Sequence, residues 1–100
     1  MCKFCEIVKK EIKSDIQYET ENLVVFPDIQ PQAPLHLLIV PKTHVQEFIK
    51  RDKKTFSEMT DLIDKIISEK DLDKKGYKLV INGGGKQLID HFHIHLMGGV

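Results

Sequence analysis

Long hydrophobic runs, tryptophan and an excess of either charge are all missing from this sequence of 100 residues. Its longest uninterrupted apolar runs, residues 23–26 and 37–40, are far too short to cross a bilayer. Fifteen basic and fifteen acidic side chains cancel, which argues against a protein held to nucleic acid or to a membrane by bulk charge. Two cysteines make no disulfide framework, and the first residues lack the layout of a signal peptide, so we expect a cytoplasmic protein.

The residues that are present, 41% apolar and 30% charged, are typical of a globular protein. No repeat or linker divides the sequence, so we expect one domain over residues 1–100. Apolar spacing predicts a short helix over residues 3–12 and a long helix over residues 53–70. Short apolar runs predict strands over residues 16–19, 23–26, 36–40, 77–81 and 91–97. Several strands with one principal helix indicate the α+β class.

Three of the five histidines occupy alternate positions of the last predicted strand, His91, His93 and His95. Because strand side chains alternate, the three imidazoles share one face, with about 7 Å between neighbours. Such a stripe can ligate a metal ion or supply nucleophilic and acid–base groups near neutral pH. One ion bound by all three rings is the least favoured of these, since metal–nitrogen bonds of about 2 Å would require awkward rotamers. A stripe of solvent-facing polar residues is the structural alternative.

A second motif, Cys2-x-x-Cys5, has the spacing of a metal chelate. A redox motif of the thioredoxin type normally follows a strand, and only Met1 precedes Cys2, while two small buried thiols are the structural alternative. We favour zinc, because a cysteine at this position would fray unless it were tied down. His44 and His91 are candidates for two further ligands, which would make a closed structural site.

Two loops give weaker signals. Asp28 opens a loop with prolines that leads to His36, and an isolated aspartate before prolines is usually a turn residue. The three glycines after Asn82 lack the lysine motif of a phosphate-binding loop. Their N–H groups could still serve an oxyanion near the histidine stripe.

Taken together, these motifs resemble the histidine triad family. Residues 91–97, His-Phe-His-Ile-His-Leu-Met, match its alternation of histidines with apolar residues. Residues 28–36 resemble a preceding loop of the family, residues 37–42 its strand ending in Pro-Lys, and residues 78–83 the strand and asparagine before the triad. The short chain is similar to the branch of nucleoside phosphoramidate hydrolases, and the Cys-x-x-Cys start to its zinc-carrying members.

The resemblance implies an antiparallel sheet of about five strands with one long and one short helix. It also implies a hydrolase or transferase that attacks the α-phosphate of purine nucleotide conjugates, such as nucleoside phosphoramidates and aminoacyl-adenylates. His93 would be the nucleophile and form a nucleotidyl-histidine, His95 would contact the phosphate and leaving group, and His36 would complete the polar cluster. Asp28 would accept from the ribose hydroxyls, and Asn82 would hydrogen-bond the phosphate. The residues expected around the base are Phe4, Ile7, Phe26, Ile29 and Leu38, of which Leu38 could equally be ordinary core. The residues expected to hold a structural zinc ion are Cys2, Cys5, His44 and His91.

The sequence departs from the family at Leu88, where relatives usually carry a serine or threonine that helps to protonate the leaving group. This departure keeps open a second function, a nucleotide-binding or interaction module with little turnover. A dinucleoside polyphosphate hydrolase is a further alternative.

The resemblance also implies a homodimer that forms through the long helix and the strand after it. The sequence adds its own reasons, because Leu62 and Ile66 widen the apolar side of the helix, and a strand at a sheet edge leaves N–H and C=O groups unpaired. The alternative is a helix whose apolar side is covered by its own sheet.

Overall fold

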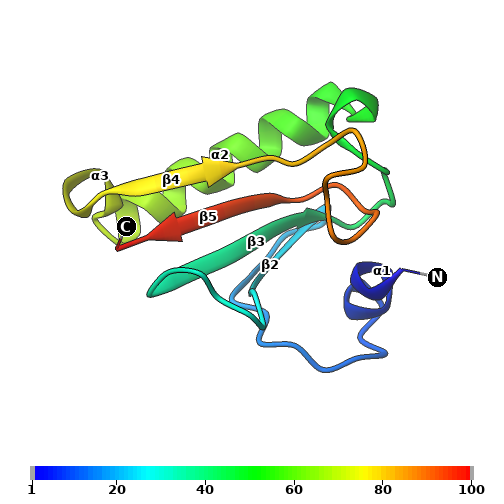
Figure 1. Ribbon diagram of the computed structural model, residues 1–100, viewed down its shortest axis with the longest axis horizontal. Helices are drawn as coiled ribbons and strands as arrows, with labels where there is room; N and C mark the ends of the chain where they lie inside the picture. The colour runs from blue at the N-terminus through cyan, green and yellow to red at the C-terminus, as the bar shows by residue number, and fades with distance from the viewer. Residues whose placement is uncertain (1, 100) are drawn as a thin grey trace.

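The computed structural model describes residues 2–99 and contains one five-stranded antiparallel sheet with the strand order β1-β2-β3-β5-β4 (Figure 1). The strands are β1 (Tyr18–Glu19), β2 (Leu23–Pro27), β3 (Leu35–Pro41), β4 (Tyr77–Val80) and β5 (Ile94–Gly98). The helices are α1 (Lys3–Val8), α2 (Lys53–Glu69) and α3 (Leu72–Lys75), with a 3-10 turn η1 (Phe48–Lys50). The predicted α+β class, with about five strands, one long helix and one short helix, is confirmed. The short α3 and η1 were not anticipated.

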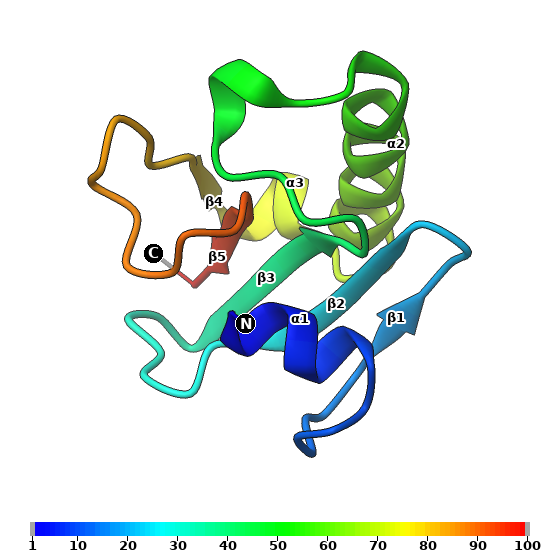
Figure 2. The same ribbon diagram turned by 90° about the vertical axis from the view of Figure 1, so that its right-hand side faces the viewer.

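Strands β2 and β3 are buried on both faces, because α2 covers one face of the sheet and α1 covers the other (Figure 2). Leu23 and Val25 of β2 pack toward α2, whereas Val24 and Phe26 pack toward α1. This double burial explains why β2 and β3 have continuous apolar runs rather than alternating ones. The face covered by α1 is only partly filled, and it carries the functional residues described below.

The first helix is shorter than the predicted range of 3–12, because it stops at Val8. Lys10 adopts a left-handed conformation with φ of 62°, and the N–H of Glu11 donates to the carbonyl of Glu6. The N–H of Lys10 also donates to the carbonyl of Ile7, which completes the hydrogen-bond pattern of a Schellman cap. Glycine normally marks this position, so a lysine there gave no sequence signal for the helix end.

The last strand begins at Ile94, three residues later than the predicted start at His91. Extending the β3–β5 register places Phe92 opposite Pro41, which has no N–H group to offer. The N–H of Phe92 donates instead to the carbonyl of Val45. The alternation of side chains nevertheless persists, since Phe92 packs in the core under α2 while the His91 and His93 rings contact Phe4 of α1.

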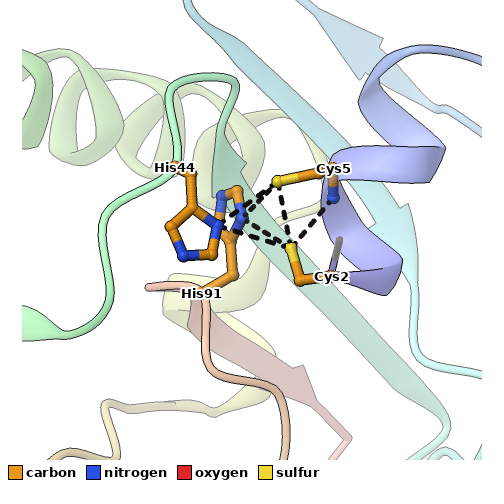
Figure 3. Close-up of side chains that lie close together, drawn as sticks. All are labelled: Cys2, Cys5, His44 and His91. Carbon is orange, nitrogen blue, oxygen red and sulfur yellow. Dashed lines mark hydrogen bonds between the residues drawn. The ribbon is translucent and has the colours of Figure 1, made fainter.

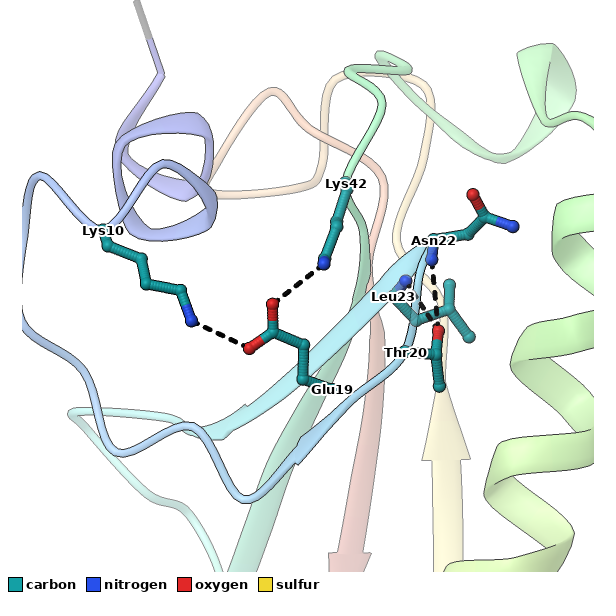
Figure 4. Close-up of polar contacts among 6 residues, drawn as sticks. All are labelled: Lys10, Glu19, Thr20, Asn22, Leu23 and Lys42. Carbon is teal, nitrogen blue, oxygen red and sulfur yellow. Dashed lines mark hydrogen bonds and ion pairs between the residues drawn. The ribbon is translucent and has the colours of Figure 1, made fainter.

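The turn between β1 and β2 is held by side-chain hydrogen bonds (Figure 4). Thr20 Oγ1 accepts from the N–H groups of Asn22 and Leu23, at 3.2 and 3.0 Å. Glu19 accepts from Lys42 at 2.8 Å and from Lys10 at 2.9 Å, and these two hydrogen bonds lower the pKa of Glu19 to about 2. Glu19 thereby joins the chain after α1 to the end of β3.

One reason for expecting a dimer is wrong: the apolar side of α2 is covered by its own sheet. Leu62 and Ile66 are both buried in the core that α2 forms with β2, β3 and β5. The other reason stands, because β4 is an edge strand whose Leu79 side chain is 45% exposed. No helix in the described part of the chain has the length and apolar character needed to cross a membrane.

We predict that two copies of the chain pair along the free edge of β4, where backbone N–H and C=O groups lack partners. Analytical ultracentrifugation at tens of micromolar should give a dimer for the wild type and a monomer for Leu79→Glu, which places like charges near the twofold axis. Ile49→Glu, which introduces the same charge at an exposed residue of η1, should remain dimeric. A wild type that is monomeric at this concentration would contradict the predicted dimer.

Candidate functional site

Four side chains from three separate parts of the chain meet at the N-terminal end of α1 (Figure 3). Cys2 caps the helix, with its sulfur accepting from the N–H of Cys5, and the two sulfurs lie 3.1 Å apart. His44 follows β3, and its Nδ1 lies 3.3 Å from the Cys5 sulfur. His91 precedes β5, and its Nδ1 lies 3.2 Å from the Cys2 sulfur. The structure therefore brings together all four predicted metal ligands.

These four groups fit a structural zinc ion. Tetrahedral bonds of about 2.3 Å to sulfur and about 2.0 Å to nitrogen put ligand atoms roughly 3.3–3.8 Å apart. The sulfur–sulfur and sulfur–nitrogen distances of this cluster, from 3.1 to 3.5 Å, are close to that range. Two thiolates and two imidazoles are a donor set that zinc prefers, and four protein ligands leave no open position for catalysis.

His91 is fully buried, and both its ring nitrogens have defined roles. Its Nε2 lies 2.8 Å from the carbonyl oxygen of Pro41, so the neutral ring carries its proton on Nε2 and donates it there. The Nδ1 lone pair is then directed at Cys2 and Cys5, as a metal ligand requires. Burial lowers the pKa of His91, which favours the neutral ring that binds metal.

A second set of hydrogen bonds orients His93. Its Nδ1 lies 2.7 Å from the carbonyl oxygen of His91, so Nδ1 is the protonated nitrogen and Nε2 keeps its lone pair. The ring is buried and packs edge-on against Phe4, with 5.0 Å between the ring centroids. Burial lowers the pKa of His93, so its ring is neutral near pH 7. A neutral imidazole with a free, directed nitrogen is a nucleophile.

The third histidine, His95, is linked to His36 on the neighbouring strand. The backbone N–H of Gln32 donates to His36 Nδ1 at 3.1 Å, so the proton of His36 is on Nε2. That Nε2–H donates to His95 Nδ1 at 2.9 Å, which leaves His95 with a proton on Nε2. Asp28 Oδ2 lies 3.5 Å from His36 Nε2, and Oδ1 accepts from the N–H of Gln30.

His93 and His95 line a pocket of about 600 Å³, a volume in the range of small-molecule sites. Asp28, which follows β2, and Asn82, which follows β4, also line it. All five residues expected around a base also line it. Of these, Phe4, Ile7, Phe26 and Leu38 are buried, whereas Ile29 is 78% exposed at the mouth. Leu38 is thus both core and pocket wall.

One expectation about the site needs correction, and two of the weaker possibilities find no support. The rings of His93 and His95 are 4.8 Å apart between centroids, closer than the expected 7 Å, because the side chains lean together. No group of potential ligands among residues 2–99 contains His91, His93 and His95 together, which agrees with the low rank given to a single ion bound by all three rings. The glycines after Asn82 do not line the pocket, and the N–H of Gly84 donates to Glu47 instead.

Other pocket residues were missed by reasoning from the sequence. They are polar residues of loops, the first residue of α1 and a lysine of β4, in this order: Ser14, Gln30, Gln32, Lys13, Lys3 and Lys78. Alternation along β4 could have indicated Lys78, because it shares a face with Val80. The backbone donor of Gln32 has no sequence signal at all.

Comparison with known proteins agrees with this geometry. A family model described as scavenger mRNA decapping enzyme C-term binding matches residues 1–99. A purine nucleoside phosphoramidase of Escherichia coli is 35% identical over 101 residues, covering 96% of this chain and 85% of the relative. The chain belongs to the histidine triad family.

Further histidine triad relatives match over similar lengths. A 14 kDa zinc-binding protein of maize (Zea mays) is 38% identical over 102 residues, covering 96% of this chain and 80% of the relative. A solved structure, a HIT family hydrolase from Clostridium thermocellum, has a TM-score of 0.91 with 36% identity, covering 99% of this chain and 90% of the other.

We predict about one zinc ion per chain, and the loss of this zinc in a Cys2→Ser, Cys5→Ser double variant. The double variant should also unfold at a temperature more than about 10 °C lower, because the ion joins α1 to the segments that hold His44 and His91. Elemental analysis and thermal unfolding test both points. His95→Asn, outside the cluster, should keep its zinc, and equal zinc in the wild type and double variant would refute the site.

The pKa of His95 predicts how stability depends on pH. Burial first, and then the neighbouring His93 and His36 rings, lower the pKa of His95 from 6.5 to about 4. Above pH 6.5 the ring is neutral in both folded and unfolded chains, so it contributes no pH dependence. Between about pH 6.5 and 4, His95 is protonated in the unfolded chain but stays neutral in the folded chain. The free energy of unfolding therefore falls as the pH falls. Urea unfolding should show a shallower fall for His95→Asn, and equal slopes would contradict the assigned environment.

Proposed function

We propose that this histidine triad protein hydrolyses purine nucleotide conjugates by nucleophilic attack of His93 on the α-phosphorus. The observation that carries the proposal is the orientation of His93, whose Nδ1–H is held by the His91 carbonyl while Nε2 is free to attack. The pocket beside it has a volume suited to a nucleotide. The phosphoramidase of Escherichia coli supports nucleoside phosphoramidates as the class of substrate.

The reaction has two steps that both use His93. In the first, a bond forms between Nε2 and phosphorus while the bond from phosphorus to the leaving group breaks, giving a nucleotidyl-histidine. In the second, water attacks the same phosphorus, the bond to Nε2 breaks, and a nucleoside monophosphate leaves. The His95 Nε2–H, which the hydrogen bond from His36 leaves free, donates to a phosphate oxygen or to the leaving group.

The rest of the pocket holds the nucleoside. We propose that the Asp28 carboxylate accepts from the ribose hydroxyls, and that Asn82 hydrogen-bonds the phosphate. The base lies against the apolar wall built by α1, β2 and β3, with Ile29 covering it from the mouth. These contacts leave His36 as a positioning residue, since its ring is engaged by Gln32 and His95.

Zinc has a structural part in this proposal. The Zea mays relative is named a zinc-binding protein, and Cys2, Cys5, His44 and His91 supply a matching donor set here. When bound, the ion neutralises the two thiolates and holds α1 against the segment before β5. We also propose a cytoplasmic site of action, in which the two cysteines, which form no disulfide, stay reduced.

A second candidate function is a nucleotide-binding module with little turnover. Leu88 favours it, because this side chain lines the pocket and is 94% exposed, at the position where the resemblance to the family leads us to expect a hydroxyl. The module would bind nucleotides without hydrolysing their conjugates, whereas the enzyme would do both. Incubation with a panel of adenosine and guanosine phosphoramidates separates the two.

We predict that His93→Ala lowers kcat by about 10³-fold or more, because no other group can form the covalent intermediate. Binding of nucleoside monophosphate, measured by calorimetry, should persist because the pocket walls stay in place. Acid quenching of the wild type with a substrate labelled in the α-phosphate should trap label on the protein, and the variant should trap none. Full turnover by the variant would overturn His93 as nucleophile.

A further inference from the structure

The pocket has a local excess of positive charge that the chain as a whole does not have. Basic and acidic residues balance over the sequence, whereas the pocket is lined by three lysines, Lys3, Lys13 and Lys78, and one carboxylate, Asp28. The Asp28 carboxylate is already directed at the Gln30 N–H and at His36. A cleft lined by one sign of charge concentrates ligands of the opposite sign.

The three pocket lysines have no competing partners within residues 2–99. Lysines elsewhere on the surface, such as Lys10 and Lys42, pair with Glu19, but no ion pair or hydrogen bond engages the ammonium groups of Lys3, Lys13 or Lys78. A bound anion would therefore not have to displace a carboxylate of the described chain. The electrostatic contribution of each lysine is modest, since all three side chains are exposed.

Lys78 is the lysine closest in register to the reacting histidines. In the β4–β5 ladder, Lys78 is opposite Met97 and Val80 is opposite His95. Lys78 and His95 are therefore diagonal neighbours on the pocket face, with Cα atoms about 7 Å apart, a separation that long side chains span. A group attached to a phosphate bound at His93 and His95 is therefore within reach of the Lys78 side chain.

The two ends of the pocket differ in chemistry. Across the sheet, the pocket face runs from Phe26 of β2, through Leu38 of β3 and His95 of β5, to Lys78 and Val80 of β4. The α1 and β2 end is apolar and suits a base, and the histidines in the middle suit the phosphate. The β4 end, which carries Lys78, remains for the part of the substrate beyond the phosphorus.

We propose that Lys78 makes the pocket selective for nucleotide conjugates whose leaving group carries a negative charge. The inference rests on the proposed function for the identity of the pocket, and it names a substrate class within it. An acidic amine linked to the α-phosphorus places its carboxylate near the Lys78 ammonium, whereas a neutral amine gains nothing there. Leaving groups of this class include acidic amino acids and further phosphates.

The test compares two adenosine 5′-phosphoramidates, one of aspartate and one of asparagine, each with its α-carboxylate blocked as an amide so that only the aspartate side chain is charged, by the ratio of their kcat/KM values. Intrinsic reactivity cancels when the ratio for each variant is divided by the ratio for the wild type. Lys78→Gln should lower the ratio about threefold and Lys78→Glu about tenfold, and raised salt should shrink the effect. Lys65→Glu, which makes the same charge change on α2 beyond the opposite face of the sheet, should leave the ratio unchanged.

A binding arm keeps the inference separate from the proposed hydrolysis. The Kd values of both conjugates are measured with His93→Ala and with His93→Ala, Lys78→Glu, neither of which needs to turn over. A lower preference for the aspartate conjugate in the double variant supports the inference even if the wild type hydrolyses neither compound. An equal loss of affinity for both conjugates would overturn the inference, because Lys78 would then attract any nucleotide. Failure of both conjugates to bind would overturn the nucleotide pocket itself.

Discussion

The hydrogen bond from His93 Nδ1–H to the carbonyl oxygen of His91 connects the two halves of the site. On one side of it, the His91 ring is held between the Pro41 carbonyl and the cysteine sulfurs. On the other side, the His93 ring presents its unprotonated nitrogen to the pocket. The position of the His91 carbonyl thus determines the tautomer of His93, and any displacement of His91 would rotate or release the His93 ring.

Helix α1 is short, yet it contributes to both halves. Cys2 and Cys5 are two of the four predicted zinc ligands. Phe4, which lies between them in sequence, makes edge contacts with the rings of Phe26 and His93, at 5.5 and 5.0 Å between centroids. A six-residue helix is too short to be stable alone in water, so its position depends on what holds its ends. The cluster at its start and the Schellman cap at Lys10 supply that support, and the pocket wall follows from them.

Much of the fold could be predicted because the sequence patterns reflect burial directly. The apolar runs of β2 and β3 and the helical spacing of α2 each describe a surface that must be covered, and the structure covers them all. The candidate site was foreseen where side-chain identity carries the chemistry, as with His93 and Cys2. It was not foreseen where backbone groups act, as with the Gln32 N–H that sets the proton of His36. The end of α1 and the start of β5 differ from the predicted positions for the same reason. The conformation of Lys10 and the missing N–H of Pro41 are properties of the main chain.

The strand order β3-β5-β4 has a consequence for how the chain reaches its native state. The last strand in sequence lies between two earlier ones, and Cys2 meets His91 across 89 positions of the chain. Contacts so distant in sequence are slow to form, because a large loop must close before they stabilise anything. During synthesis, α1, β2 and β3 can associate early, but β4 has no partner strand until β5 has left the ribosome. His91 and His93 directly precede β5, so the metal ligands and the His93 ring take their final positions late in folding and together.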